Sequence, residues 1–314
     1  MKNKNLNILF LGGAKRVSLA EKFIDEGKEM GVDINIFSYE LDIDVPISLV
    51  GEIIIGLRWN DSNLYNHLLE IIDTKKIDII LPFLDYATIV AAKLKKLTEG
   101  KNVFIPVSDE ERCEVFFNKK FANTWCIKND IKVPSNIDKY PLIAKPIHGS
   151  ASKGILVLES LPELNNLANK EDYLIQQFVK GREYSIDVYV SPLDKQIISI
   201  VPRIRLETQG GESIKSITLK EEFLINFSRE IIMKTGLVGP LTLQLIENSV
   251  TKDLYFMEIN PRFGGAVLNS IFAGANSPAY LLNDFYKIMN TYNEDWIDSF
   301  LMIRRFSEHY KICK

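Results

Sequence analysis

Leu241–Gly265, LTLQLIENSVTKDLYFMEINPRFGG, is the stretch that decides the fold. Two apolar runs in it, Leu241–Ile246 and Leu254–Ile259, flank a short polar segment, which predicts two antiparallel strands joined as a hairpin. One symmetric register of this hairpin places Gln244 directly opposite Glu258, with Cβ atoms about 4.5–5.5 Å apart. The sequence therefore predicts that two polar side chains meet across an otherwise apolar strand pair.

Polar side chains continue along the second strand of the hairpin. Glu258, Asn260 and Arg262 alternate along an extended chain, so their side chains emerge on one face. Together with Gln244 they bring carboxylate and amide oxygens to one point, and such hard oxygen ligands suit Mg²⁺ bridged to substrate phosphates. Arg262 would add a planar fork for phosphate or carboxylate oxygens.

The alternative interpretation of this pattern is the exposed polar face of an ordinary hairpin, which is common. Pro261 and the pair Gly264-Gly265 follow at once, and they impose an irregular backbone where a plain sheet face would continue. This irregularity favours the metal site over the ordinary hairpin.

A second motif lies upstream, in AKPIHGSASKG over residues 144–154. Lys145 ends an apolar strand and precedes a loop of small residues, an arrangement in which backbone N–H groups approach a phosphate closely and lysine adds charge. The motif is not a Walker loop, because GxxxxGK[ST] is absent. On its own it is a weak signal, because such Gly/Ser connections are more often ordinary flexible hairpin loops.

The first third of the chain alternates short β-branched runs with longer amphipathic segments. This order predicts a parallel sheet covered by helices. The expected elements are Asn7–Leu11, Val17–Met30, Ile34–Ser38, Glu52–Ile55, Leu64–Thr74, Ile77–Pro82, Tyr86–Leu97 and Val103–Val107.

The turn Gly12-Gly13-Ala14-Lys15-Arg16 lies where a dinucleotide-binding fold places its glycines. The fingerprint GxGxxG requires glycine at 14 and at 17, and the chain has Ala14 and Val17 there. We therefore expect a tight strand-to-helix turn and disfavour a nicotinamide-dependent dehydrogenase.

The chain changes character near residues 108–118, where we predict a boundary. Strands then run consecutively with helices inserted between them, which indicates an α+β body. The expected elements are a helix Glu110–Asn129, strands Leu142–Lys145, Gly154–Leu158, Tyr173–Phe178, Glu183–Val190 and Gln196–Arg203, a polar loop, a helix Lys220–Thr235, and the hairpin. The tail Glu294–Lys314 is expected to cover the core, with a docking helix as the alternative.

Composition bounds the class of protein. The chain has 314 residues, 46% of them hydrophobic and 25% charged, with 38 Lys+Arg against 41 Asp+Glu, which is typical of a folded domain rather than a disordered chain. This near-neutral balance gives no electrostatic reason to expect nucleic-acid binding. No segment has the length of a membrane span or a signal peptide, so we expect a cytoplasmic protein.

Taken together, the motifs resemble the ATP-grasp superfamily, most closely the ligases similar to half of a carbamoyl-phosphate synthase large chain. The match rests on the spacing from Gln244 to Glu258-Ile-Asn260-Pro-Arg262 and on Lys145. The resemblance implies an α/β N-terminal Rossmann-like (pre-ATP-grasp) domain over 1–112 followed by an α+β ATP-grasp fold over 113–314. The latter would divide into 113–180 with the nucleotide lid, 181–295 for metal and substrate, and 296–314 as a C-terminal tail.

The resemblance also assigns roles to residues. Gln244, Glu258 and Asn260 would hold the metal. Catalytic roles would fall to Arg262, Lys145, Arg203 and Arg205, the last two on a basic segment, VPRIR, that is alternatively a surface loop. Nucleotide contacts would come from Lys119, Lys145, His148, Ser150, Ser152, Gln177, Phe178, Val179 and Glu183. The segment 177–183 resembles the family's hinge that cradles adenine, in which Val179 would offer backbone groups to the ring and Glu183 would hold the ribose hydroxyls. Asp85, in a "Pro, two residues, Asp" segment, would lie near the substrate.

The activity that the resemblance implies is ATP-dependent carboxylate–amine ligation through an acyl phosphate, giving ADP and phosphate. Its cofactors would be ATP and Mg²⁺, with Mn²⁺ as a substitute, and its partners a small carboxylate, a small amine and a second copy in a homodimer. A kinase-like phosphotransferase and a non-catalytic ATP-binding subunit stay as alternatives. Asn118, Gln177 and Ala87 depart from the family pattern, and Ala87 leaves the substrate open.

Overall fold

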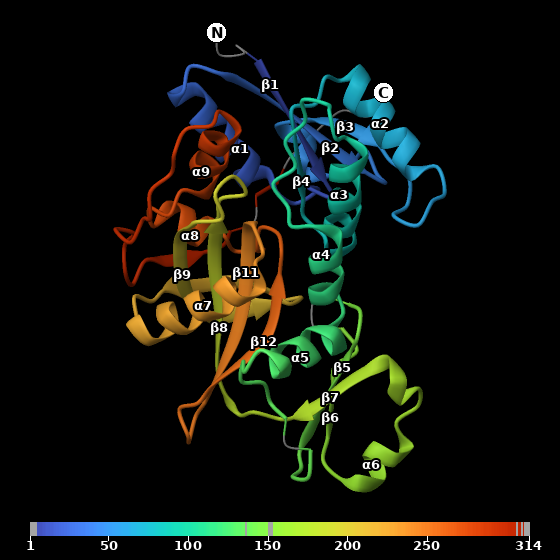
Figure 1. Ribbon diagram of the computed structural model, residues 1–314, viewed down its shortest axis with the longest axis vertical. Coiled ribbons are helices and arrows are strands. Elements are labelled where there is room, and N and C mark those ends of the chain that lie inside the picture. The colour runs from blue at the N-terminus through green and yellow to red at the C-terminus, as the bar shows by residue number, and fades with distance from the viewer. Residues whose placement is uncertain (1–4, 136, 150–152, 306, 309, 311–314) are drawn as a thin grey trace.

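The computed structural model describes residues 5–135, 137–149, 153–305, 307–308 and 310. Its strands form three sheets (Figure 1): four strands in the N-terminal region, six in the body and three in a small outlying layer. Within these ranges, no helix has the length and apolar character needed to cross a membrane.

The four-stranded sheet is parallel, as the alternating pattern predicts. Its order is β3-β2-β1-β4, from β1 (Asn5–Leu11), β2 (Asp33–Glu40), β3 (Glu52–Ile55) and β4 (Ile79–Pro82). Side chains of β1 alternate between two cores: Leu6, Ile8 and Phe10 face α1, while Leu9 and Leu11 face α2 and α3. These helices are α1 (Val17–Glu29), α2 (Leu64–Thr74) and α3 (Asp85–Leu97), with a 3₁₀ turn η1 (Pro46–Leu49) beside β3.

The strand expected at Val103–Val107 is wrong, because only one parallel bridge forms there, between Ile79 and Phe104. Phe104 donates its N–H to Asp78 and accepts from Ile80. The next ladder bond would need the N–H of residue 106, which is Pro106 and has none, so the strand stops.

The single helix expected over Glu110–Asn129 is also wrong. It is two helices, α4 (Glu110–Phe117) and α5 (Lys119–Lys128), separated by Asn118 in an extended conformation. The Asn118 side chain accepts hydrogen bonds from the N–H groups of Lys120 and Phe121, at 2.9 and 3.2 Å. It therefore caps the second helix, a role that asparagine fills as well as aspartate.

The six-stranded sheet is antiparallel, in the order β12-β11-β8-β9-β10-β13. Apolar residues on one face of it pack under α5 and α7 (Glu222–Thr235). Its strands are β8 (Gly181–Val190), β9 (Ile197–Gln209), β10 (Glu212–Thr218), β11 (Gly239–Asn248), β12 (Leu254–Asn260) and β13 (Leu301–Ile303). Helices α8 (Leu268–Phe272) and α9 (Ser277–Phe285) follow β12.

Two expectations about this sheet change. The segment after Arg203 is not a polar loop, because β9 continues to Gln209 and pairs with β10 through a turn of two positive-φ glycines at 210 and 211. The tail forms no docking helix: Trp296 is 1% exposed against Val201, and β13 adds an edge strand to β10. Trp296 covers the core as expected, whereas Leu301 on β13 is 46% exposed.

The third sheet is small, with the order β6-β5-β7. It comprises β5 (Leu142–Pro146), β6 (Leu156–Leu158) and β7 (Tyr173–Gln177), and α6 (Leu161–Asn166) and η2 (Lys170–Asp172) connect the last two. It lies at the far end of the molecule from the parallel sheet (Figure 1). Because α5 contacts both β7 and β12, this layer is set against the hairpin end of the large sheet.

Candidate active site

One cavity of about 1540 Å³ is lined by residues of the large sheet, the small sheet and the N-terminal region. The small sheet contributes Lys145, the large sheet contributes Gln244 and Glu258, and the N-terminal region contributes Arg16 and Asp85. The polar face of β11 and β12 lines it, whereas Leu243 and Leu245 of β11 are fully buried on the opposite face. The alternation of the hairpin sequence thus separates a core face from a site face.

The register expected from the hairpin sequence is observed: Gln244 is paired with Glu258. Oε1 of Glu258 accepts hydrogen bonds from Nε2 of Gln244 at 2.7 Å and from Nδ2 of Asn260 at 3.1 Å. A bulge follows Gln244, where the pairing shifts by one residue. Three polar side chains therefore converge on one point of the cavity wall, as the alternation predicts.

The donor set at this point fits a hard divalent cation. A rotation of each terminal amide would replace the nitrogen with the oxygen, so Gln244 and Asn260 can offer oxygens beside the Glu258 carboxylate. No cluster of three or more His, Cys, Asp or Glu suited to a metal occurs in the described part of the chain. A site with a single carboxylate matches Mg²⁺, which keeps water and substrate phosphate ligands.

Lys145, on β5 of the small sheet, lines the same cavity as these residues. It is 7% exposed, and its Nζ donates to Oε1 of Gln176 at 3.3 Å. Burial lowers the pKa of Lys145, the carboxylates of Glu258 and Glu183 counteract this, and Lys119 adds to the lowering. The two carboxylates therefore favour the charged form of Lys145, but they do not fully compensate for its desolvation.

The loop after Lys145 contacts the start of α5. Lys119 bonds to this loop twice: its Nζ donates to the carbonyl of Gly149 at 2.9 Å, and its N–H donates to that of Ile147 at 3.2 Å. The ring of His148 stacks on Phe117 with centroids 4.9 Å apart. The two predicted nucleotide contacts of this loop, Ser150 and Ser152, lie outside the described residues.

The segment expected to cradle adenine lies at the end of β7. Gln177 pairs with Leu142, and the N–H of Phe178 donates to the carbonyl of Pro141 at 3.1 Å, so that N–H is already engaged. Val179 is 8% exposed, and Gln177, Phe178 and Val179 are not among the residues of the cavity lining. Their contacts with a nucleotide stay predictions.

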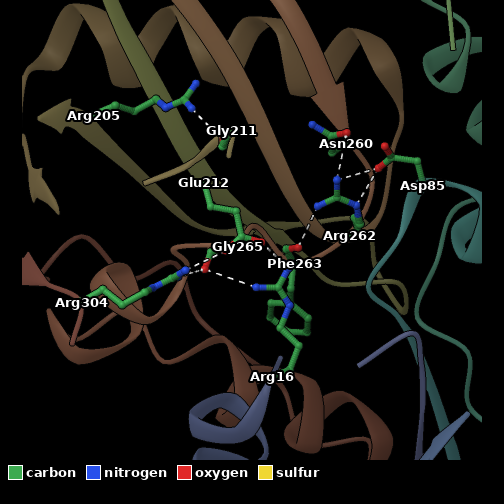
Figure 2. Close-up of polar contacts among 10 residues, drawn as sticks. All are labelled: Arg16, Asp85, Arg205, Gly211, Glu212, Asn260, Arg262, Phe263, Gly265 and Arg304. Atoms are coloured by element: carbon green, nitrogen blue, oxygen red, sulfur yellow. Dashed lines mark hydrogen bonds and ion pairs between the residues drawn. The ribbon is translucent and has the colours of Figure 1, made fainter. Parts of the chain in front are cut away.

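Arg262 and Asp85 join the hairpin to the N-terminal region. Nε and Nη2 of Arg262 both contact Oδ1 of Asp85, at 2.7 and 2.6 Å, and Nη2 lies 3.5 Å from Oδ1 of Asn260 (Figure 2). Asp85 begins α3, directly after β4 and its turn. Two motifs 177 residues apart thus meet beside the Glu258 cluster.

Arg203 and Arg205 lie on β9 and not on a surface loop. Arg203 is 1% exposed and forms a bidentate ion pair with Asp187, at 2.7 and 3.1 Å. Arg205 donates to Oε2 of Glu183 at 3.1 Å and to the carbonyl of Gly211 at 2.9 Å. Glu183, expected to hold ribose hydroxyls, is thus tied to the β9–β10 turn, and the catalytic roles of both arginines stay predictions.

Among the arginines that line the cavity, sequence reasoning missed Arg16, Arg304 and Arg305, and the first two share a partner. Arg16, which the sequence presents only as part of a glycine turn, and Arg304, from the end of β13, both contact Glu212. Arg16 precedes α1, at the carboxyl end of a parallel strand. Ligands of such sheets bind at this end, so the position of Arg16 in the sequence could have identified it as a site residue. Arg304 carried none, because only the tertiary fold brings the tail to the cavity.

Comparison with known proteins agrees with this geometry. Residues 117–266 match the family model described as ATP-grasp domain. A D-alanine–D-alanine ligase of Aquifex aeolicus (strain VF5) is 25% identical over 257 residues, covering 74% of this chain and 80% of that protein.

Two solved structures share the fold. The biotin carboxylase domain dimer of Hydrogenobacter thermophilus 2-oxoglutarate carboxylase, solved with MgADP, ADP and bicarbonate, has a TM-score of 0.73 at 14% identity, covering 93% of this chain and 72% of that one. An L-amino acid ligase from Bacillus licheniformis has a TM-score of 0.68 at 18% identity, covering 92% and 76%.

Proposed function

We propose that this chain, whose residues 117–266 match the ATP-grasp domain model, is an ATP-dependent carboxylate–amine ligase. It would join a small acid to a small amine through an acyl phosphate, with release of ADP and phosphate. The curated relative named as a D-alanine–D-alanine ligase and the structural neighbour named as an L-amino acid ligase support this class of reaction.

The observation that carries the proposal is that Lys145 lines the same cavity as Gln244, Glu258 and Asn260, with the Glu258 carboxylate acting to raise its pKa. A polyphosphate between them would meet an ammonium group from the small sheet and oxygen ligands for its metal from the large sheet. Phosphoryl transfer requires little more of a protein than such positioning and charge neutralisation.

The chemistry follows from this placement. A carboxylate oxygen of the acid attacks the γ-phosphorus, the bond from that phosphorus to the bridging oxygen breaks, and ADP leaves. The amine nitrogen then attacks the acyl carbon, the bond from that carbon to the phosphate oxygen breaks, and the nitrogen loses a proton to solvent. No side chain of the protein has to form a covalent bond.

Residues of the chain would serve these steps by binding and orientation. Lys145 and Lys119 would hold phosphate oxygens, and Arg262, positioned by Asp85, would hold the acid beside them. Gln244, Glu258 and Asn260 would hold Mg²⁺, or Mn²⁺ in its place. The metal supplies neutralisation of charge on the transferred phosphoryl group.

Several finer assignments belong to the same proposal. The parallel sheet β3-β2-β1-β4 supports a Rossmann-like N-terminal domain ahead of the ATP-grasp fold. A homodimer and a cytoplasmic location follow from the resemblance to the family.

The test is ADP release with Mg²⁺ and ATP across a matrix of carboxylic acids, amino acids included, crossed with amines. Glu258→Gln serves as the blank, because it keeps the shape of the side chain and removes its charge. We expect release that needs both an acid and an amine, with less than a tenth of it left in Glu258→Gln. Release with an acid alone and a stable phosphorylated product would indicate a kinase. ATP binding without any release would indicate a binding subunit.

A further inference from the structure

The cavity ends, beyond Arg262, in a group of charged side chains that the proposed phosphoryl transfer does not use. We call it the Arg16–Arg304 site: Arg16 before α1, Arg304 after β13, Glu212 at the start of β10, and the carbonyl of Gly265. These parts come from four separate segments of the chain and converge on one point (Figure 2).

The two guanidinium groups share the same acceptors. Arg304 donates from Nη1 to Oε2 of Glu212 at 2.7 Å, and Nη2 of Arg16 lies 3.5 Å from Oε1 of the same carboxylate. Both arginines also donate to the carbonyl oxygen of Gly265, Arg16 from Nη1 at 3.4 Å and Arg304 from Nη2. A carboxylate thus fits between the two guanidinium groups, as the side chain of Glu212 demonstrates.

Positive charge exceeds negative charge at this site. Burial would raise the pKa of Glu212, but Arg16, Arg304 and Lys15 outweigh it and lower that pKa below the usual value. Burial lowers the pKa of Arg16, Glu212 counteracts this, and Arg262 and Arg304 add to the lowering. Arg16, Arg304 and Lys15 act on the single carboxylate of Glu212, which leaves a surplus of positive charge that an anion would neutralise.

The site is open to a ligand and close to the reacting centre. The side chains of Arg16, Glu212 and Arg304 keep 14%, 35% and 27% of their surface exposed, and all three line the cavity. From Arg262 to Gly265 the chain advances three residues, at most about 10 Å even when fully extended. One small molecule is therefore long enough to contact both Arg262 and the Arg16–Arg304 site.

We propose that the Arg16–Arg304 site binds a substrate carboxylate other than the one that is phosphorylated. One of the two substrates would then carry this second anionic group: the acid is a dicarboxylic acid, or the amine is an amino acid. The inference rests on the proposed ligase function, and it adds the substrate class.

A binding experiment tests the site without turnover. The probes are matched pairs that differ by one carboxylate, glutarate against its monoamide and alanine against alaninamide, at constant ionic strength with MgADP. We expect the carboxylate form of one pair to raise the Tm of the wild-type protein more than its amide does. Arg304→Gln should abolish this difference and Arg304→Lys should restore part of it.

The matched control is Arg229→Gln, which removes an arginine that contacts Tyr292 away from the cavity. It should keep the wild-type difference between carboxylate and amide. Equal Tm values for both members of both pairs in the wild-type protein would overturn the proposal. So would a difference that survives in Arg304→Gln.

Turnover then separates this inference from the proposed function. The test uses an acid–amine pair that supports ADP release. Amidation of the second carboxylate should raise the KM of the substrate that carries it at least tenfold in the wild-type protein. The same amidation should have little further effect in Arg304→Gln. The substrate whose amide loses activity tells whether the acid or the amine carries the group. Carboxylate binding without ADP release would refute the ligase and keep the site, whereas release indifferent to both amides would refute the site alone.

Discussion

Replacing Asp187 by asparagine tests how much the buried ion pair between Asp187 and Arg203 stabilises the fold. Asp187 and Arg203 form an ion pair whose side chains are 7% and 2% exposed. The carboxylate accepts from Nε and Nη2 of Arg203, and also from Ser270 at 2.6 Å and Thr242 at 3.4 Å. The asparagine side chain would keep the shape, lose the charge and turn an NH₂ group toward donors.

The expected cost follows from burial. Removing one partner of a buried ion pair leaves an uncompensated charge and costs roughly 3–5 kcal/mol. Nη1 of Arg203 is buried and has no hydrogen-bond partner among the described residues, so the guanidinium has no second acceptor to replace Asp187. We therefore place Asp187→Asn in this range, and expect Arg203→Met in the same chain to recover part of the loss because the buried charge is then gone.

The assay is urea unfolding followed by tryptophan fluorescence, in which Trp296 reports from beside β9. Asp25→Asn is the control, since the Asp25–Lys28 pair has 60% and 66% of its side-chain surface exposed and should contribute less than about 1 kcal/mol. A loss below about 1 kcal/mol for Asp187→Asn, or a double variant less stable than Asp187→Asn, would refute the reasoning.

Three further predictions concern the site. Lys145→Ala should weaken ATP binding about 10- to 100-fold, as expected for a charge-assisted contact of roughly 1.5–3 kcal/mol, and an unchanged Kd by calorimetry would remove Lys145 from the site. Gly264→Ala should lower stability by about 1–3 kcal/mol, because its Cβ would lie 2.6 Å from Oγ1 of Thr242; a Tm equal to that of the wild-type protein would contradict this. The lowered pKa of Glu212 means that its ion pairs stabilise the fold above pH 4.5 and that this stability is lost as the pH falls through the lowered value. Glu212→Gln should therefore lower the urea midpoint at about pH 7 and much less at about pH 3, and an equal loss at both would count against it.

Local pattern was enough to predict the strand pair that carries the candidate metal site. The register of Gln244 and Glu258 follows from the symmetry of one hairpin, so sequence alone predicts it. The lack of a strand beyond Phe104 depends on Pro106, whose missing N–H is a feature of the sequence that outweighs the apolar pattern around it. The break at Asn118 depends on a cap that interrupts an otherwise continuous helical pattern.

Contacts between distant segments were beyond sequence reasoning. Arg203 carries the same local pattern as Arg205, yet one is buried on Asp187 and the other reaches Glu183, because the sheet brings different neighbours to each. Arg304 lies in a tail without a motif, and its position follows only from the pairing of β13 with β10.

Mn²⁺ binding in the presence of ADP, followed by electron paramagnetic resonance, tests the assignment of a metal–nucleotide site to Gln244, Glu258 and Asn260. This measurement needs no knowledge of the acid or the amine. We expect the wild-type protein to bind Mn²⁺–ADP and Glu258→Gln to bind it at least tenfold more weakly. Glu207→Gln, which removes an exposed carboxylate on the same sheet, should not differ from wild type. Equal Mn²⁺–ADP affinity in the wild-type protein and Glu258→Gln would contradict the assignment.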